Sequence, residues 1–166
     1  MRQTPDKELN ALDITVGVIT NSDDRIPGIL SSLGLNVGSP RHGMGLSSKN
    51  SNSEEDINFV VMSYDVGHEK PAREIFDAAR ALAGASPTQG NWCLHVGDDL
   101  DKDYKGAEAA DWESVLLCKP DHAETLYTKG IPYITDLLEL KDHIIGDAAE
   151  VHLQSRQRLR GMRAER

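Results

Sequence analysis

Four aspartates lie within one six-residue segment, "DDLDKD": Asp98, Asp99, Asp101 and Asp103. Carboxylates this close repel one another, which raises their pKa values unless a cation or strong hydrogen-bond donors neutralise them. A glycine precedes the segment and a Gly-Ala turn follows it, which favours a functional loop over a merely solvated turn. Mg²⁺ takes carboxylate oxygens as ligands. The segment is therefore a candidate metal-binding loop.

Three further candidates lie at or after the ends of two other apolar runs. Thr20 and Asn21 come at the end of "ITVGVIT", and Lys70 comes shortly after "INFVVMS". In a parallel sheet, functional groups gather at the carboxyl ends of the strands, so a hydroxyl, an ammonium group and the acids would converge on one edge. Such a set suits a phosphate beside Mg²⁺, with the hydroxyl and the ammonium group on the phosphoryl oxygens.

Each candidate also has an ordinary structural interpretation. Thr20 could simply end a strand, Asn21 could cap the next helix, and Lys70 could be a surface lysine at a helix start. His95 alternates with apolar neighbours on a strand, which favours a packed histidine over a metal ligand. The other histidines show no metal-site spacing.

The elements that must position these residues alternate along the chain. Buried apolar runs predict strands at residues 14–20, 57–63, 92–97 and 113–118, with a short edge strand at 131–135. Helical patterns occupy residues 24–34, 71–84, 104–111 and the chain from 136 onward. Pro71 at the first helical position and Gly84 at the end mark the clearest helix. The alternation predicts the α/β class, with a mainly parallel sheet and flanking helices.

Length and composition limit the remaining possibilities. The 166 residues suit one domain, with a lead-in at 1–13, a core at 14–146, a flexible insertion at 36–56 and a basic helix or tail at 147–166. The net charge of −9 argues against a nucleic-acid partner, and no apolar span predicts a membrane segment or signal peptide. Cys93 and Cys118 suit buried free thiols in a reducing compartment. We therefore expect a cytoplasmic protein, with the nucleus as the alternative.

Three motifs, in this order, resemble those of the haloacid dehalogenase-like (HAD) hydrolase superfamily. "VGVITNSD" resembles the second motif of that family, "SYDVGHEKPAREIF" the third, and "HVGDDLDKDYKGAEAADW" the fourth. The resemblance covers residues 14–138. It implies a Rossmann-like core and Mg²⁺-dependent hydrolysis of a small phosphorylated molecule.

The resemblance also implies a role for each matching residue. It puts Thr20 and Asn21 on the phosphate and makes Lys70 the lysine that stabilises charge during catalysis. It puts Asp98 on Mg²⁺, and the catalytic Asp103 beside the metal or the lysine.

The first motif of the family is missing. That motif is an apolar strand followed by Asp-x-Asp, which supplies the nucleophile, and residues 1–13 contain neither feature. We also expect these 166 residues to contain no cap domain. We therefore expect a truncated, incomplete core that binds Mg²⁺ weakly and performs no covalent turnover. We also expect the strand ending at Thr20 to pair directly with the strand ending at Asp98, or the domain to be loosely packed.

Other functions stay open. The main alternative is a non-catalytic interaction or regulatory protein that keeps the HAD scaffold and binds a protein partner. A phosphoacceptor receiver domain also uses acids, Thr and Lys around Mg²⁺, but in a different order along the chain. A dinucleotide-binding fold is disfavoured because no G-x-G-x-x-G follows the first strand.

Overall fold

The computed structural model describes residues 14–39, 42, 55–85, 92–140 and 144. Its strands are β1 (Gly17–Thr20), β2 (Phe59–Met62), β3 (Leu94–Gly97), β4 (Glu113–Leu117) and β5 (Tyr133–Ile134). Its helices are α2 (Ile26–Ser32), α3 (Ser63–Val66), α4 (Arg73–Leu82), the π-helical turn η2 (Leu100–Lys105), α5 (Gly106–Ala109), the 3₁₀ turn η3 (Pro120–His122) and α6 (Ala123–Thr128). The strands are all paired in parallel, which confirms the α/β class predicted from the sequence.

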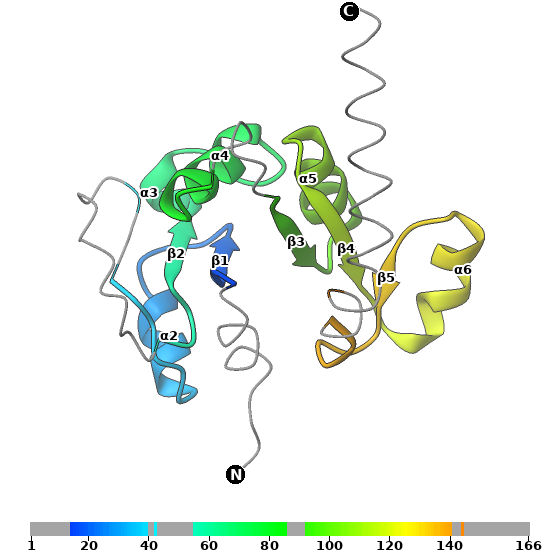
Figure 1. Ribbon diagram of the computed structural model, residues 1–166, viewed down its shortest axis with the longest axis horizontal. Coiled ribbons are helices and arrows are strands. Elements are labelled where there is room, and N and C mark those ends of the chain that lie inside the picture. The colour runs from blue at the N-terminus through cyan, green and yellow to red at the C-terminus, as the bar shows by residue number, and fades with distance from the viewer. Residues whose placement is uncertain (1–13, 40–41, 43–54, 86–91, 141–143, 145–166) are drawn as a thin grey trace, which may run out of the picture.

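The strands of the described part form two sheets. β1 pairs with β2, whereas β4 lies between β3 and β5 in a second sheet. Figure 1 shows the two sheets side by side, with α4 and α5 near each other on the same side of them. Since β1 and β3 belong to different sheets in the described part, the first of the two predicted outcomes, direct pairing between these strands, is wrong, and the second, a loosely packed domain, stays a prediction. Lys70, which follows β2 and α3, makes polar contacts with both sheet units, because its Nζ donates to Asp103 after β3 and to the carbonyl of Ile19 on β1.

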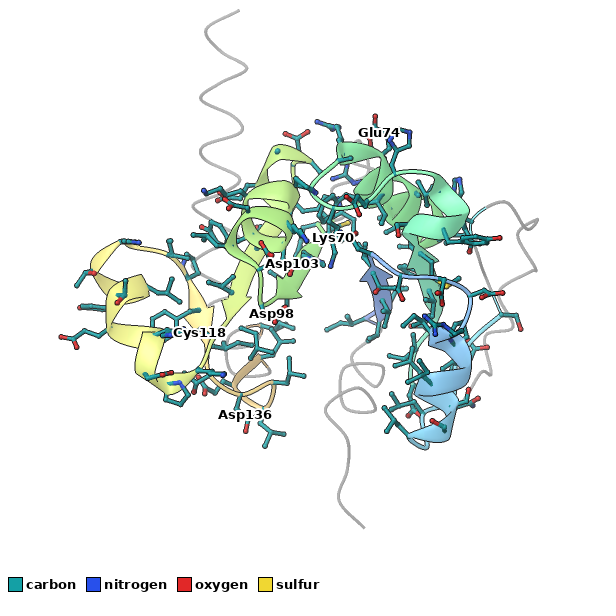
Figure 2. All side chains as sticks on the ribbon, turned by 180° about the vertical axis from the view of Figure 1, so that it is seen from behind. Lys70, Glu74, Asp98, Asp103, Cys118 and Asp136 are labelled. Carbon is teal, nitrogen blue, oxygen red and sulfur yellow. The ribbon has the colours of Figure 1, made fainter. Side chains whose placement is uncertain are left out.

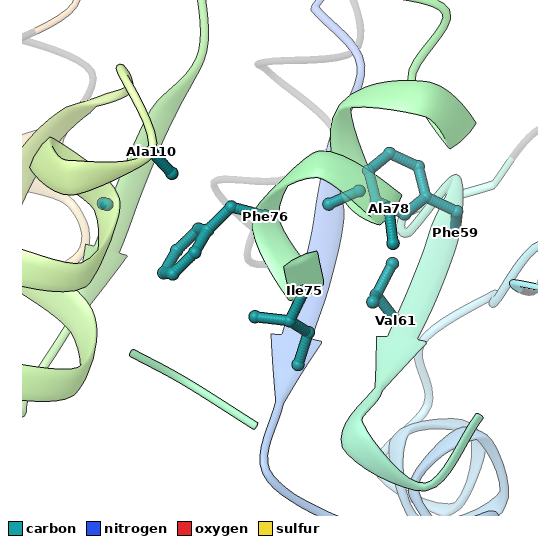
Figure 3. Packing of buried hydrophobic residues seen from close by; sticks show 8 residues of the cluster. Phe59, Val61, Ile75, Phe76, Ala78 and Ala110 are labelled. Atoms are coloured by element: carbon teal, nitrogen blue, oxygen red, sulfur yellow. The ribbon is translucent and has the colours of Figure 1, made fainter. Parts of the chain in front are cut away.

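Helix α4 packs against both sheets. Its buried residues are Ile75, Phe76, Ala78 and Ala79. Figure 3 shows Ala78 near Phe59 and Val61 of β2, while Phe76 points away from them, toward Ala110 after α5. The Phe76 ring also meets His95 of β3 edge-on, with the ring centroids 5.3 Å apart. One helix therefore supplies apolar surface to both halves of the core.

The local sequence explains where α4 begins and ends. Ala72 is the N-cap, so Pro71 precedes the helix and does not occupy its first position as predicted. Glu74 in the first turn and Arg80 in the last turn complement the helix dipole. After the helix, Gly84 adopts φ +65°, a left-handed conformation that glycine tolerates at a helix end.

Several predicted segments lie outside the described residues. These are the lead-in at 1–13, the basic tail at 147–166 and most of the insertion at 36–56. The two ends of the insertion lie together, since the N–H of Asp56 donates to the carbonyl of Asn36 over 2.8 Å. No helix of the described part is long and apolar enough to cross a bilayer. Both cysteines are free thiols, and both are half-buried, not fully buried.

Candidate functional site

A buried ion pair joins a segment that follows the first sheet (β1 and β2) to a turn that follows β3 of the second sheet. The Lys70 Nζ lies 2.6 Å from Oδ1 of Asp103, and the two side chains are only 13% and 6% exposed. The same ammonium group donates a second hydrogen bond, of 3.0 Å, to the carbonyl oxygen of Ile19 on β1. Figure 2 shows Lys70 and Asp103 directed toward each other. The pair thus links the segment after α3 to the turn after β3.

The carboxylate of Asp103 accepts hydrogen bonds from three donors. Besides Lys70, Oδ1 accepts from the Nε2 of His95 over 2.9 Å, and Oδ2 accepts from the N–H of Asp99 over 3.0 Å. Burial favours the neutral acid, but the bonds from His95, Lys70 and Asp99 outweigh it and hold the pKa of Asp103 well below its usual range. Gly97 makes this arrangement possible, because a Cβ there would overlap the carboxyl group.

Asn21 holds the backbone that carries Lys70. Its Oδ1 accepts from the N–H of Lys70 over 2.7 Å, and its Nδ2 donates to the carbonyl of the same residue over 3.0 Å. The amide therefore satisfies both backbone polar groups of Lys70, which precedes a cis peptide bond to Pro71. This contact positions the lysine.

The four acids of the loop after β3 have different environments. Asp99 caps η2, because its side chain accepts two backbone N–H groups of that turn at 2.9 Å each. Asp101 pairs with Lys105 at the surface, where both side chains are more than half exposed. Asp103 belongs to the buried ion pair. Asp98 is exposed like Asp101, but it is the one acid of the four that makes no hydrogen bond or ion pair with the described residues.

The described residues include one carboxylate that suits a metal ion. No group of three or more His, Cys, Asp or Glu side chains converges on a metal position within the described part. Asp98 nevertheless offers an exposed, unpaired carboxylate at the end of β3, beside Asp103 (Figure 2). Mg²⁺ is commonly held by one or two carboxylates, with water and substrate phosphates completing its shell. Among the described residues, Asp98 is therefore a single candidate ligand for Mg²⁺ and does not form a metal site by itself.

The structure unites some of the predicted site residues and leaves others apart. It brings Lys70, Asp103 and Asn21 into direct contact. The hydroxyl of Thr20, half-buried at the end of β1, makes no hydrogen bond with the described residues. The packing predicted for His95 is correct, but its hydrogen bond to Asp103 was missed. A histidine within an apolar strand beside an acidic loop is the sequence signal that could have found this contact.

The sequence of the chain is similar to one hydrolase family and to longer proteins. The family model "haloacid dehalogenase-like hydrolase" matches residues 7–111. The Rhythmically expressed gene 2 protein of Drosophila melanogaster is 30% identical over 117 residues, which are 70% of this chain and 38% of that protein. Human haloacid dehalogenase-like hydrolase domain-containing protein 3 is 28% identical over 145 residues, 87% of this chain and 46% of that protein. The chain thus spans less than half the length of these relatives.

A solved structure has a similar fold. The HAD phosphatase from Thermococcus onnurineus aligns with a TM-score of 0.64 at 21% identity, over 86% of this chain and 56% of that chain. At this identity the likeness concerns the fold, and it agrees with the Rossmann-like core that the motifs imply. The matched family model covers more than half of the chain and includes Thr20, Lys70 and Asp103. The chain therefore belongs to the haloacid dehalogenase-like hydrolase family.

Proposed function

We propose that this chain carries the phosphate-binding and metal-binding residues of a HAD-type phosphohydrolase. Lys70 and Thr20 would contact the phosphoryl oxygens, and Asp98 would supply one ligand to Mg²⁺. The observation that carries the proposal is the hydrogen bonding of the Lys70 ammonium group. It is buried and held by two acceptors, Asp103 and the carbonyl of Ile19. Since an ammonium group has three N–H donors, one stays available for a phosphoryl oxygen.

Each residue would have a distinct part in binding. Asp103 orients the ammonium group of Lys70, because its Oδ1 accepts a hydrogen bond from Nζ over 2.6 Å. The hydroxyl of Thr20 has no partner among the described residues and is free to donate to a phosphate. Mg²⁺, when bound at Asp98, would offset the charge of the phosphate. The ligand class is thus a small phosphorylated molecule.

Covalent turnover by the described residues is not part of the proposal. Attack on phosphorus needs a carboxylate oxygen that is free and in line with the leaving group. The carboxylates of Asp99, Asp101 and Asp103 are each engaged by other donors, and we assign Asp98 to the metal. We therefore expect no hydrolysis from these acids. A non-catalytic regulatory role on the same scaffold, with a protein partner, is the alternative.

The experiment measures phosphate binding and hydrolysis separately. Inorganic phosphate is titrated into the purified chain with Mg²⁺ present, by calorimetry or ³¹P NMR. Thr20→Val and Asp98→Asn are informative variants because neither side chain has a hydrogen-bond partner within the described part. Lys102→Met, which removes an exposed lysine from the same loop, is the matched control.

We expect saturable binding that both variants weaken and the control leaves unchanged. Loss of a single hydrogen bond to a charged group corresponds to at least about a tenfold weaker Kd. Hydrolysis of p-nitrophenyl phosphate should stay at background for every protein. Absence of phosphate binding in the unmodified chain would refute the binding proposal. Turnover that Asp98→Asn abolishes would refute the expectation of inactivity.

A further inference from the structure

We propose that His95 is a positioning residue of this site. Its Nε2–H, donated to Oδ1 of Asp103, fixes the carboxylate that in turn orients the ammonium group of Lys70. The inference rests on the proposed phosphate-binding role of Lys70 for its functional meaning. The geometry of the three side chains can be tested independently of that role.

The first observation is that one oxygen atom serves two donors. Oδ1 of Asp103 lies 2.6 Å from the Nζ of Lys70 and 2.9 Å from the Nε2 of His95. An ionised carboxylate only accepts hydrogen bonds, so the Nε2 of His95 must carry a hydrogen. The contact thereby defines the protonation of that ring nitrogen. His95 acts on the lysine only through Asp103, without touching it directly in any contact described above.

The second observation is that the imidazole ring is itself held in place. His95 is 8% exposed, and its ring meets the fully buried Phe76 edge-on at an interplanar angle of 88°. Phe76 comes from α4, the helix that packs against both sheets. A ring fixed on one side by a helix and on the other by Asp103 is a rigid donor. Such support makes a hydrogen bond effective in orienting its acceptor.

The third observation is that the donors approach Asp103 from different elements. His95 lies on β3, Lys70 follows α3, and Asp99 donates to Oδ2 from the start of η2. Three donors on two oxygens define both the position and the plane of the carboxylate. Without His95, Oδ1 keeps only the flexible lysine as a donor, and the two charged groups can shift together. The expected consequence is a less ordered ammonium group, not an unfolded chain.

The first test needs no variant. Long-range ¹H–¹⁵N NMR of the imidazole distinguishes the two neutral tautomers of histidine. We expect a protonated Nε2 at His95 at neutral pH. A neutral ring protonated only at Nδ1 would overturn the proposal, because it could not donate to Asp103.

The second test compares two substitutions at His95. His95→Gln keeps an N–H donor at nearly the place of Nε2, whereas His95→Phe keeps the ring without the donor. In protein labelled with ¹⁵N-lysine, Lys70 should give an ammonium signal protected from exchange with water. We expect this signal to persist in His95→Gln and to disappear in His95→Phe, with the far-UV circular dichroism unchanged. His122→Phe, at a side chain that is 71% exposed, is the matched control.

The Kd for inorganic phosphate is the functional readout. We expect it to rise about fivefold to tenfold in His95→Phe and to stay near the original value in His95→Gln. An unchanged lysine signal in both variants, or its loss in both, would overturn the proposal, since the rescue by the retained donor would be missing. If the signals behave as expected but no protein binds phosphate, the positioning inference stands and the proposed function fails.

Discussion

Replacing Asp103 with Asn should destabilise the chain by about 3–5 kcal/mol, because it leaves the buried ammonium group of Lys70 without its counter-charge. The lysine side chain is only 13% exposed, so water cannot fully replace the carboxylate. The side-chain amide that replaces the carboxylate also cannot accept all of its hydrogen bonds. Oδ2 of Asp103 now accepts the N–H of Asp99, and an amide nitrogen in that position would face another donor.

Replacing Lys70 with Met should cost less, about 1–3 kcal/mol. The charge of Asp103 then persists, but His95 and the N–H of Asp99 still donate to it. In the double variant neither buried charge remains. The combined cost should therefore fall below the sum of the single costs by about 1–3 kcal/mol, as is usual for side chains in direct contact.

Urea unfolding at neutral pH, followed by far-UV circular dichroism, measures these free energies. Asp101→Asn is the matched control from the same loop, because it breaks a surface pair whose side chains are 76% and 61% exposed. That control should change stability by less than about 1 kcal/mol. The reasoning is refuted if the two single effects add to within about 0.5 kcal/mol, or if Asp103→Asn costs no more than the control.

Two further predictions concern the same carboxylate. The folded pKa of Asp103 lies below its unfolded value of about 4, so its contribution to stability is complete above that pH and is lost as the pH falls further. As the pH is lowered through the acid range, the urea midpoint should therefore fall less steeply for Asp103→Asn than for the unmodified chain. Parallel curves of midpoint against pH would contradict the lowered pKa of Asp103. Gly97→Ala should destabilise by about 1–3 kcal/mol, because the added Cβ overlaps the carboxyl of Asp103. Gly28→Ala, in α2 with no atom near the added Cβ, should instead be neutral or stabilising. Urea unfolding measures both variants, and equal losses of stability at the two glycines would show that overlap is not the cause.

The class of the fold and the order of its strands could be predicted from the sequence, but helix α6 between β4 and β5 was missed. Runs such as Phe59–Met62 are apolar at every position, and all four residues are buried, which is typical of a parallel strand covered on both faces. The amphipathic pattern of α4 and the strand before Asp98 are equally local signals. Each depends on the periodicity of a few neighbouring residues, so a single sequence suffices to recognise it.

The membership of the site was predicted in part. The motifs singled out Lys70, Asn21 and Asp103, and the structure brings these three into contact. The specific roles could not be read from the motifs. The amide of Asn21, expected on a phosphate, contacts the backbone of Lys70 in the structure, and its phosphate-binding role stays a prediction.

Only the tertiary structure determined which acid is buried in an ion pair, which acid lies at the surface, and which strands pair with each other. Asp103 and Asp101 are neighbours in a single acidic segment, yet one is buried and the other is at the surface. Their difference arises because Lys70, 33 residues away in sequence, reaches one of them. The division into two sheets likewise depends on long-range pairing between β1 and β2 and between β3 and β4. Local propensity carries no information about such distant partners, because their contacts exist only once the chain has folded.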